Sequence, residues 1–308
     1  MTLNGLYLVD KERGITSHDV VARFRRAAKT KKVGHTGTLD PLATGLLILC
    51  VGSTTRLQSY LTGMSKTYEG EIRFGWATET QDAEGIAVGE QIPDVVARDL
   101  DPEALFARFR GTISQIPPSY SSKKIGGRRA HEMARAGEVP QLEPRDVVVE
   151  ELEVTSVEGP MVRVRIRCSA GTYVRTIAHD AGQAAGVGAH LTGLRRTRIG
   201  PYDVDESRVS DQLSELRPDQ IEADPAFRGM ERIELPIPSV MLDPMQIRAV
   251  RHGQEVIVKP AGVEIDAEST PEVGLSDSRG TIVGIGKVSH ATRDGGPLIV
   301  QPRVILAG

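Results

Sequence analysis

The side chain in this sequence best placed to do chemistry is a carboxylate on a glycine-rich turn. Asp40 lies in the stretch 34–45, Gly-His-Thr-Gly-Thr-Leu-Asp-Pro-Leu-Ala-Thr-Gly, directly before the apolar run 46–51. The glycines suit tight turns or close approach of another chain, and Pro41 biases Asp40 away from helical backbone. A carboxylate held this rigidly is a candidate acid, base or nucleophile. A surface turn whose aspartate merely caps the next element is an equally good interpretation of the local residues.

Two further residues could complete such a site. Tyr68 lies in an alternating segment that predicts a half-buried strand, and Arg175 follows a glycine turn at the start of a predicted helix. A tyrosine ring can stack on a planar base, and a guanidinium beside a carboxylate favours its ionised form. Each residue also has a plain structural interpretation: Tyr68 as core, Arg175 as an ordinary ion pair, and His35 as a partner for its own turn.

Several other chemistries are not expected. The sequence has no Walker-type phosphate loop, no complete dinucleotide fingerprint and no Gly-x-Ser-x-Gly elbow. Its seven histidines form no i, i+4 pair and adjoin no Cys-x-x-Cys, so we expect no metal site. Cys50 and Cys168 lie in strand-like segments, which favours buried free thiols in a reducing cytoplasm. No apolar run is long enough to span a membrane and no secretory signal is visible, so we expect a cytoplasmic protein.

The net charge of −3 is distributed unevenly along the chain. Acidic residues concentrate at 203–224, whereas three basic clusters adjoin glycine turns. These clusters are Arg23, Arg25, Arg26, Lys29, Lys31 and Lys32; Lys123, Lys124, Arg128, Arg129 and Arg135; and Arg195, Arg196 and Arg198. Because phosphate binding responds to the local field, the chain is compatible with an RNA partner. Each cluster could instead be a solvated face.

The elements that must position these residues follow from hydrophobic periodicity. Strands are predicted at 6–9, 68–74, 147–157 and 162–168, and helices from Thr16 or Ser17 and from Thr172 to about Ala185. A turn at 186–190 then leads into the basic segment 194–198. Residues 217–235 are predicted to form an interdomain connector. Short strands at 254–258, 263–265, 281–288 and 298–305 predict a small β-rich C-terminal domain.

With these residues in place, the chain resembles the pseudouridine synthases of the bacterial tRNA pseudouridine-55 type. The resemblance covers about residues 5 to 200, and Glu12-Arg13 depart from it where the family usually has a proline after the lysine. The matching motifs, in chain order, are 10–19, 34–45, 66–68, 116–124, 168–176 and 188–196.

The resemblance implies an α+β fold with two domains. Residues 1–230 would form a mixed catalytic domain around a long, antiparallel-rich central sheet, with an RNA-binding insertion at about 116–140. Residues 235–308 would form a β-rich, PUA-like RNA-binding domain. The implied reaction isomerises uridine to pseudouridine at position 55 in the T loop of tRNA, with the T arm as partner and without cofactor or metal. Few large surface patches are inferred, so we expect a monomer.

The same resemblance implies a role for each candidate residue. Asp40 would be the catalytic carboxylate and Arg175 its ion-pair partner. Tyr68 would stack on the flipped uracil, and His35 would fill the space that the base leaves. Tyr173 and Leu194 would line the uracil pocket. Contacts to phosphates would come from Lys123, Lys124, Arg128, Arg129, Arg195, Arg196 and Arg198.

Two alternative functions remain at this point. One is a guide-dependent synthase within a ribonucleoprotein, against which the insertion argues, because a stand-alone enzyme needs its own grip on RNA. The other is a tRNA-folding chaperone without catalysis, which an intact set of Asp40, Tyr68 and Arg175 disfavours.

Overall fold

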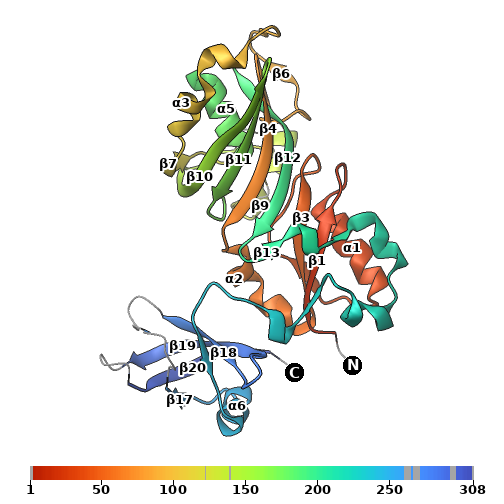
Figure 1. Ribbon diagram of the computed structural model, residues 1–308, viewed down its shortest axis with the longest axis vertical. Coiled ribbons are helices and arrows are strands. Elements are labelled where there is room, and N and C mark those ends of the chain that lie inside the picture. Colours follow the sequence, from red (N-terminus) through yellow and green to blue (C-terminus); the bar gives the residue numbers. More distant parts are fainter. Residues whose placement is uncertain are drawn as a thin grey trace.

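An 11-stranded mixed sheet runs through most of the computed structural model of the chain (Figure 1). The structure describes residues 3–121, 123–138, 140–259, 265, 271–291 and 296–306. The strands of this sheet are β1 (Gly5–Lys11), β2 (Val33–His35), β3 (Thr44–Val51), β4 (Lys66–Phe74), β7 (Gly111–Gln115), β10 (Arg145–Glu158), β11 (Met161–Cys168), β12 (Ala189–Ile199), β13 (Tyr202–Asp203), β14 (Arg208–Val209) and β15 (Phe227–Gly229). Their order is β14-β1-β3-β12-β4-β11-β10-β7, with β2, β13 and β15 attached to β3, β12 and β1. The predicted α+β class is confirmed.

The strands with strict alternation form as predicted. β11 pairs antiparallel with both β4 and β10, and its apolar residues point into the core. Its arginines point outward and pair with glutamates of the neighbouring strands, as in Arg163–Glu71 at 3.2 Å and Arg167–Glu150 at 2.8 Å. This face of the sheet is therefore covered by cross-strand ion pairs.

Two apolar cores lie along the sheet. The first packs β1 and β3 against α1 (Ser17–Ala27), whose N-cap Thr16 forms a capping box with Asp19. The second packs β4, β10 and β11 against α5 (Val174–Ala184) and α3 (Pro102–Ala107). Leu39, Leu42 and Ala43 belong to the second core, although their loop emerges from the strands of the first. The Asp40 loop therefore spans both halves of the domain.

The two halves of the sheet join through β12. This strand pairs antiparallel with β4 over most of its length but parallel with β3 only at Arg195↔Thr44 and Arg196↔Gly45. Gly45 has φ +99°, and a Cβ on it would lie 2.2 Å from the carbonyl oxygen of Arg196. Glycine is required here because the two backbones touch.

Shorter elements surround the large sheet. Two short strand pairs are separate from the large sheet: β5 (Ala77–Thr78) with β6 (Ala87–Val88), and β8 (Lys124–Ile125) with β9 (Arg128–Arg129). The helices α2 (Gln58–Thr62) and α4 (Ala130–Arg135) lie in the same part of the chain as α1, α3 and α5. β8, β9 and α4 lie within the predicted insertion at about 116–140. The loop between β5 and β6 returns to the large sheet, where Asp82 bridges Leu191.

Two predictions along this part of the chain are wrong. Ala189 and His190 do not belong to a turn, because they begin β12, and the basic segment 194–198 continues that central strand. Bulges at Leu191/Gly193 and Arg196/Arg198 break the two-residue period that would have identified it. The expected connector 217–235 also packs largely against the large sheet: Ile221 is fully buried and β15 pairs with β1.

A second sheet forms the C-terminal part of the chain, with strand order β16-β18-β19-β20-β17. Its elements are β16 (Ser239–Met241), β17 (Val256–Val258), β18 (Glu272–Ser276), β19 (Ile282–Ala291), β20 (Leu298–Ile305) and the unpredicted helix α6 (Pro244–Arg251). Residues 263 and 264 of one predicted strand lie outside the described residues. Ile282, Ile285 and Leu306 join the apolar cluster of the first core, so this sheet packs directly against the part of the chain that forms that core.

Candidate active site

A cavity of about 410 Å³ lies beside the junction of β3, β12 and β4. Its walls come from the Asp40 loop, from β4, from the turn before α5 and from β12. The structure brings all the predicted catalytic and base-binding residues to this cavity, which are Asp40, His35, Tyr68, Tyr173, Arg175 and Leu194. Buried Arg196 lines it as well, although it was predicted to contact RNA phosphates.

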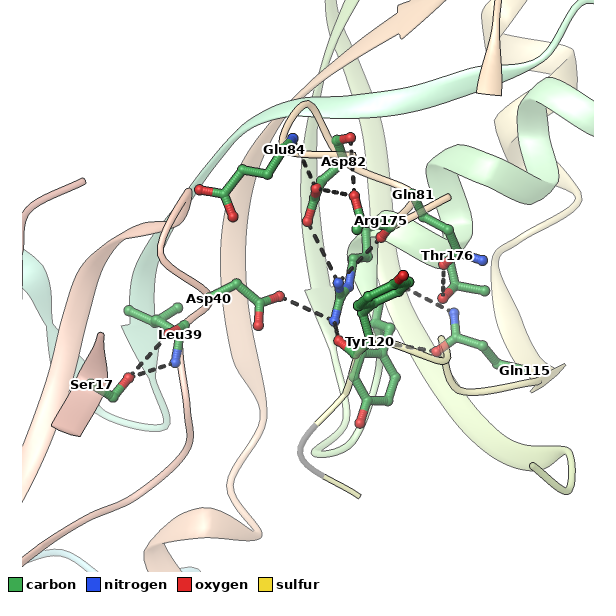
Figure 2. A network of polar contacts seen from close by, with 12 residues as sticks. Ser17, Leu39, Asp40, Gln81, Asp82, Glu84, Gln115, Tyr120, Arg175 and Thr176 are labelled. Atoms are coloured by element: carbon green, nitrogen blue, oxygen red, sulfur yellow. Dashed lines mark hydrogen bonds and ion pairs between the residues drawn. The ribbon is translucent and has the colours of Figure 1, made fainter. Parts of the chain in front are cut away.

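The backbone around Asp40 is clamped from outside the loop. Ser17 Oγ accepts a hydrogen bond from the Leu39 amide at 2.9 Å and donates one to the Leu39 carbonyl at 3.2 Å (Figure 2). The Pro41 carbonyl accepts from the Gly14 amide at 2.8 Å. The turn at residues 12–15 therefore holds the loop, and the departure from the family pattern at Glu12-Arg13 leaves this contact in place.

The Asp40 carboxylate faces a buried guanidinium. Its Oδ2 lies 3.3 Å from Arg175 Nη2, and the two side chains are 43% and 6% exposed. Arg175 Nη1 lies 3.5 Å from Asp82 on the opposite side, so one cation separates two carboxylates (Figure 2). The guanidinium also donates to the carbonyls of Tyr120 at 2.7 Å and Thr80 at 3.2 Å. Asp40 is thus paired across the cavity instead of capping its own turn.

Asp82 is the site residue that the sequence analysis missed. It is buried, and its Oδ1 accepts hydrogen bonds from Thr80 Oγ1 at 2.5 Å and from the Glu84 amide at 3.1 Å. The polar segment 78–85 has no hydrophobic periodicity and contains none of the predicted site residues. Nothing in the sequence near Asp82 indicates a role in the site. Asp82 reaches Arg175 only because the β5–β6 loop folds back onto β12.

The start of α5 is fixed by side-chain contacts that orient Arg175. Gln115 accepts from the Tyr173 amide at 2.8 Å and donates to the Tyr173 carbonyl at 3.0 Å. Thr176 donates to Gln81 at 2.8 Å. Tyr173 is the N-cap of α5, and its ring centroid lies 5.9 Å from the Arg175 guanidinium carbon. These bonds hold both the ring and the cation at the cavity wall.

Burial shifts the titration of two predicted residues. Tyr68 is buried, and burial raises the pKa of its hydroxyl, although the positive charge of Arg196 opposes that shift. Burial, together with the charges of His18 and Arg196, lowers the pKa of His35 to about 4. His35 is therefore a neutral ring at neutral pH, with the His18 ring centroid 5.7 Å away.

Two buried lysines support the same region. Lys66 lines the cavity and donates to the carbonyls of Thr62 and Met64, both at 2.5 Å. Lys11 donates to the carbonyls of Glu12 at 2.9 Å and Ile15 at 2.8 Å. Burial lowers the pKa of each ammonium to about 8. Both lysines donate hydrogen bonds to backbone carbonyls, Lys66 at the cavity and Lys11 at the turn that precedes α1, so both have structural roles.

The residues that were predicted to contact phosphates differ in their environments. Arg195 forms a bidentate pair with Asp10 at 2.7 and 3.0 Å, and Arg128 forms one with Glu138 at 3.0 Å for both bonds. Arg198 lies 3.3 Å from Asp203. Lys123 is half-buried, and the side chains of Lys124 and Arg129 lie outside the described parts of the chain.

For Arg196 the predicted phosphate contact is wrong. The residue is 1% exposed. Its Nε donates to the Leu46 carbonyl at 2.7 Å and its Nη2 to the Gly37 carbonyl at 3.0 Å. The guanidinium is therefore satisfied inside the protein, beneath the Asp40 loop.

Three further properties of the chain bear on its function. Among the described residues, no group of three or more His, Cys, Asp or Glu side chains could hold a metal ion. Both cysteines are buried and free, as predicted. Within the described ranges, no helix is long and apolar enough to span a membrane.

Comparison with solved structures identifies the class of fold. A chain in the crystal structure of a Cbf5-Nop10-Gar1 complex superposes with a TM-score of 0.73 at 28% identity, covering 98% of this chain and 84% of that one. A chain in the structure of an H/ACA RNP bound to a substrate RNA containing 2'-deoxyuridine gives the same TM-score at 24% identity, covering 99% and 85%. The fold is that of the Cbf5/TruB-type pseudouridine synthases.

Sequence comparison narrows the class to a family. The family model of the TruB family pseudouridylate synthase N-terminal domain matches residues 25–174, and that of the tRNA pseudouridylate synthase B C-terminal domain matches residues 175–231. The tRNA pseudouridine synthase B of Solibacter usitatus is 41% identical, covering 93% of this chain and 96% of its own. That of Thermobifida fusca is also 41% identical, covering 99% of both chains. The chain therefore belongs to the TruB family of pseudouridylate synthases, which are isomerases.

Proposed function

We propose that this protein isomerises uridine to pseudouridine at position 55 in the T loop of tRNA, with Asp40 as the catalytic carboxylate. Relatives that are about two-fifths identical over nearly the whole chain and are named tRNA pseudouridine synthase B support tRNA as the substrate. The observation that carries the catalytic assignment is the ion pair between Asp40 and buried Arg175 at the wall of a cavity that Tyr68 also lines.

The reaction exchanges one glycosidic bond for another. The bond between C1′ and N1 breaks, the uracil turns, and C5 bonds to C1′; C5 loses its proton, and N1 gains one. Asp40 either adds to the sugar or the base as a nucleophile, or removes a proton from the ribose. Each role requires a negatively charged carboxylate, and the Arg175 guanidinium is its partner in an ion pair at 3.3 Å. Because Asp82 holds that guanidinium from the other side, Arg175 stays in place while Asp40 reacts.

The cavity suits a base taken out of its stack. Extruding a nucleotide costs a few kcal/mol, which contacts to the flipped base must offset. We assign the stacking surface to Tyr68 and the flanking walls to Tyr173 and Leu194, all of which line the cavity. His35 is neutral and half-buried, so it can occupy the apolar space that the flipped base leaves without bringing a charge into the stack.

The grip on RNA is assigned to basic residues around this cavity and to the C-terminal sheet. Lys123, Lys124, Arg128, Arg129 and Arg195 would bind phosphates, so that their contribution depends on salt. The residues 235–308 would act as a PUA-like RNA-binding domain. The insertion between β7 and β10 gives the protein its own contact to substrate, which favours a stand-alone enzyme over a guide-dependent one.

Mapping of pseudouridine on an unmodified tRNA transcript tests this proposal. The purified protein alone should convert a single uridine, at position 55, without added metal ion, nucleotide or guide RNA. A transcript with cytidine at position 55 is the matched control and should remain unmodified. Conversion at another position would refute the substrate assignment, and a requirement for guide RNA would favour the ribonucleoprotein alternative.

A further inference from the structure

Arg196 occupies one of two adjacent positions of β12 where the three strands that carry the site meet. In the β12–β4 ladder it lies opposite Tyr68, and in the β12–β3 ladder it lies opposite Gly45. The β12–β3 ladder has only one other residue pair, Arg195↔Thr44. Backbone pairing alone therefore gives a short connection between the half of the sheet that carries the Asp40 loop and the half that carries Tyr68.

The Arg196 side chain bridges the base of the Asp40 loop. Its two hydrogen bonds reach the carbonyl of Gly37, three residues before Asp40, and the carbonyl of Leu46, six residues after it. A planar guanidinium suits this task, because its donors are fixed relative to one another and can reach two acceptors at once. The same guanidinium lines the cavity beside Tyr68, so it touches both parts of the site.

The charge of Arg196 has no carboxylate partner in the described part of the chain. Its two carbonyl acceptors offset part of the cost of burying a cation, but an apolar side chain would avoid that cost altogether. The neighbouring arginine behaves differently: Arg195 is 39% exposed and is paired with Asp10. A buried arginine without a carboxylate partner at the joint of the sheet therefore points to a role in the geometry of the site.

We propose that Arg196 is a positioning residue that sets the distance between the Asp40 carboxylate and the base stacked on Tyr68. It does so by tying both ends of the Asp40 loop to β12 at the residue that pairs with Tyr68. The inference rests on the proposed roles of Asp40 and Tyr68, but it does not depend on which uridine is modified.

The test compares Arg196→Lys and Arg196→Met with Arg163→Lys and Arg163→Met, which change an exposed arginine of β11 that is paired with Glu71. The readouts are the single-turnover rate on the RNA that the wild-type enzyme modifies, the dissociation constant for that RNA, its salt dependence, and the urea unfolding midpoint. For Arg196→Lys we expect a rate reduced by about tenfold or more with RNA affinity within about twofold of wild type and an unchanged salt slope. The Arg163 variants should retain the wild-type rate, because Arg163 lies in a surface ion pair.

A chemical rescue separates positioning from general support of the fold. In Arg196→Ala, free guanidinium ion should restore part of the lost rate at saturating RNA, whereas sodium chloride at equal ionic strength should not. Arg163→Ala should gain nothing from guanidinium. An unchanged rate in both Arg196→Lys and Arg196→Met would overturn the proposal. Weaker RNA binding by the Arg196 variants, with a flatter salt slope and an unchanged reaction rate, would also overturn it. The same holds if their reaction rates fall in proportion to their unfolding midpoints and guanidinium does not restore the rate of Arg196→Ala. If the wild-type protein modified no uridine, the proposed function itself would fail.

Discussion

Replacing Arg175 with lysine perturbs the contact on which the site depends. The guanidinium makes four contacts through two nitrogens: to the carboxylates of Asp40 and Asp82 at 3.3 and 3.5 Å, and to the carbonyls of Tyr120 and Thr80 at 2.7 and 3.2 Å. A lysine keeps the charge but has a single nitrogen that cannot reach groups on opposite sides of a guanidinium. At least two of the four contacts should be lost.

The magnitude follows from the kind of contact that is lost. A hydrogen bond to a charged group contributes about 1.5–3 kcal/mol, so two of them would be about 3–6 kcal/mol without relaxation. We expect relaxation to recover part of this and leave a cost of about 3 kcal/mol in the transition state, which corresponds to roughly a 100-fold lower rate. The affinity for tRNA should hardly change, because Arg175 is 6% exposed and cannot contribute much to phosphate binding.

Single-turnover pseudouridine formation at saturating tRNA measures the effect, with tRNA binding measured separately. Arg163→Lys is the matched control, since its guanidinium is 54% exposed in a surface pair with Glu71. Such pairs contribute about 0–1 kcal/mol, so the control should react at the wild-type rate. A rate for Arg175→Lys within about threefold of wild type, which is less than 1 kcal/mol, would refute the account of Arg175.

Three other properties follow from the same structure. A Cβ at Gly45 would lie 2.2 Å from a backbone oxygen of β12, so Gly45→Ala should lower the free energy of unfolding in urea by more than about 3 kcal/mol. The control Gly159→Ala, at positive φ in open space, should lower it by only about 1–3 kcal/mol. Equal losses for the two variants would contradict the close-contact argument. The pKa of His35 is about 4 when folded and 6.5 in an unstructured peptide, so the unfolded chain binds the extra proton and stability should fall by up to about 3 kcal/mol as the pH drops from 6.5 to 4. His35→Asn should show a flatter pH dependence than wild type, and an identical profile would exclude His35 as its source. Combined Lys123→Ala and Lys124→Ala should weaken tRNA binding and reduce its salt slope by about 1–2, and an unchanged slope would count against the insertion as a phosphate contact.

The sequence predicts those parts of the fold in which local pattern and tertiary environment agree. Strict alternation identifies β11, and the Thr16–Asp19 capping box identifies the start of α1. β12 is not predicted as a strand, because its two bulges interrupt the alternation of side chains and its arginines make this central strand resemble a basic surface segment. The segment 217–235 is wrongly predicted as a connector, because its acidic composition suggests an exposed segment although residues such as Ile221 and Phe227 are buried.

The candidate site shows the same division. Local chemistry leaves the purpose of Asp40 open, and only the ordered set of family motifs links it to Tyr68 and Arg175. Asp82 has no such signal, because a long-range loop contact brings it to the site. Arg195 and Arg196 are neighbours in the sequence, and their different environments follow from the strand, whose successive side chains point to opposite faces. Without the strand, nothing in the sequence distinguishes the buried arginine from the exposed one.

The most direct test of the central claim is the behaviour of Asp40→Asn. This change keeps the shape of the side chain and removes the negative charge that faces Arg175 at 3.3 Å. With unmodified tRNA transcript, the variant should form no pseudouridine at position 55 over many wild-type turnover times, while its affinity for the tRNA and its unfolding midpoint stay close to those of wild type. Pseudouridine formed by Asp40→Asn at a rate near that of the wild-type enzyme would contradict the assignment of Asp40 as the catalytic residue.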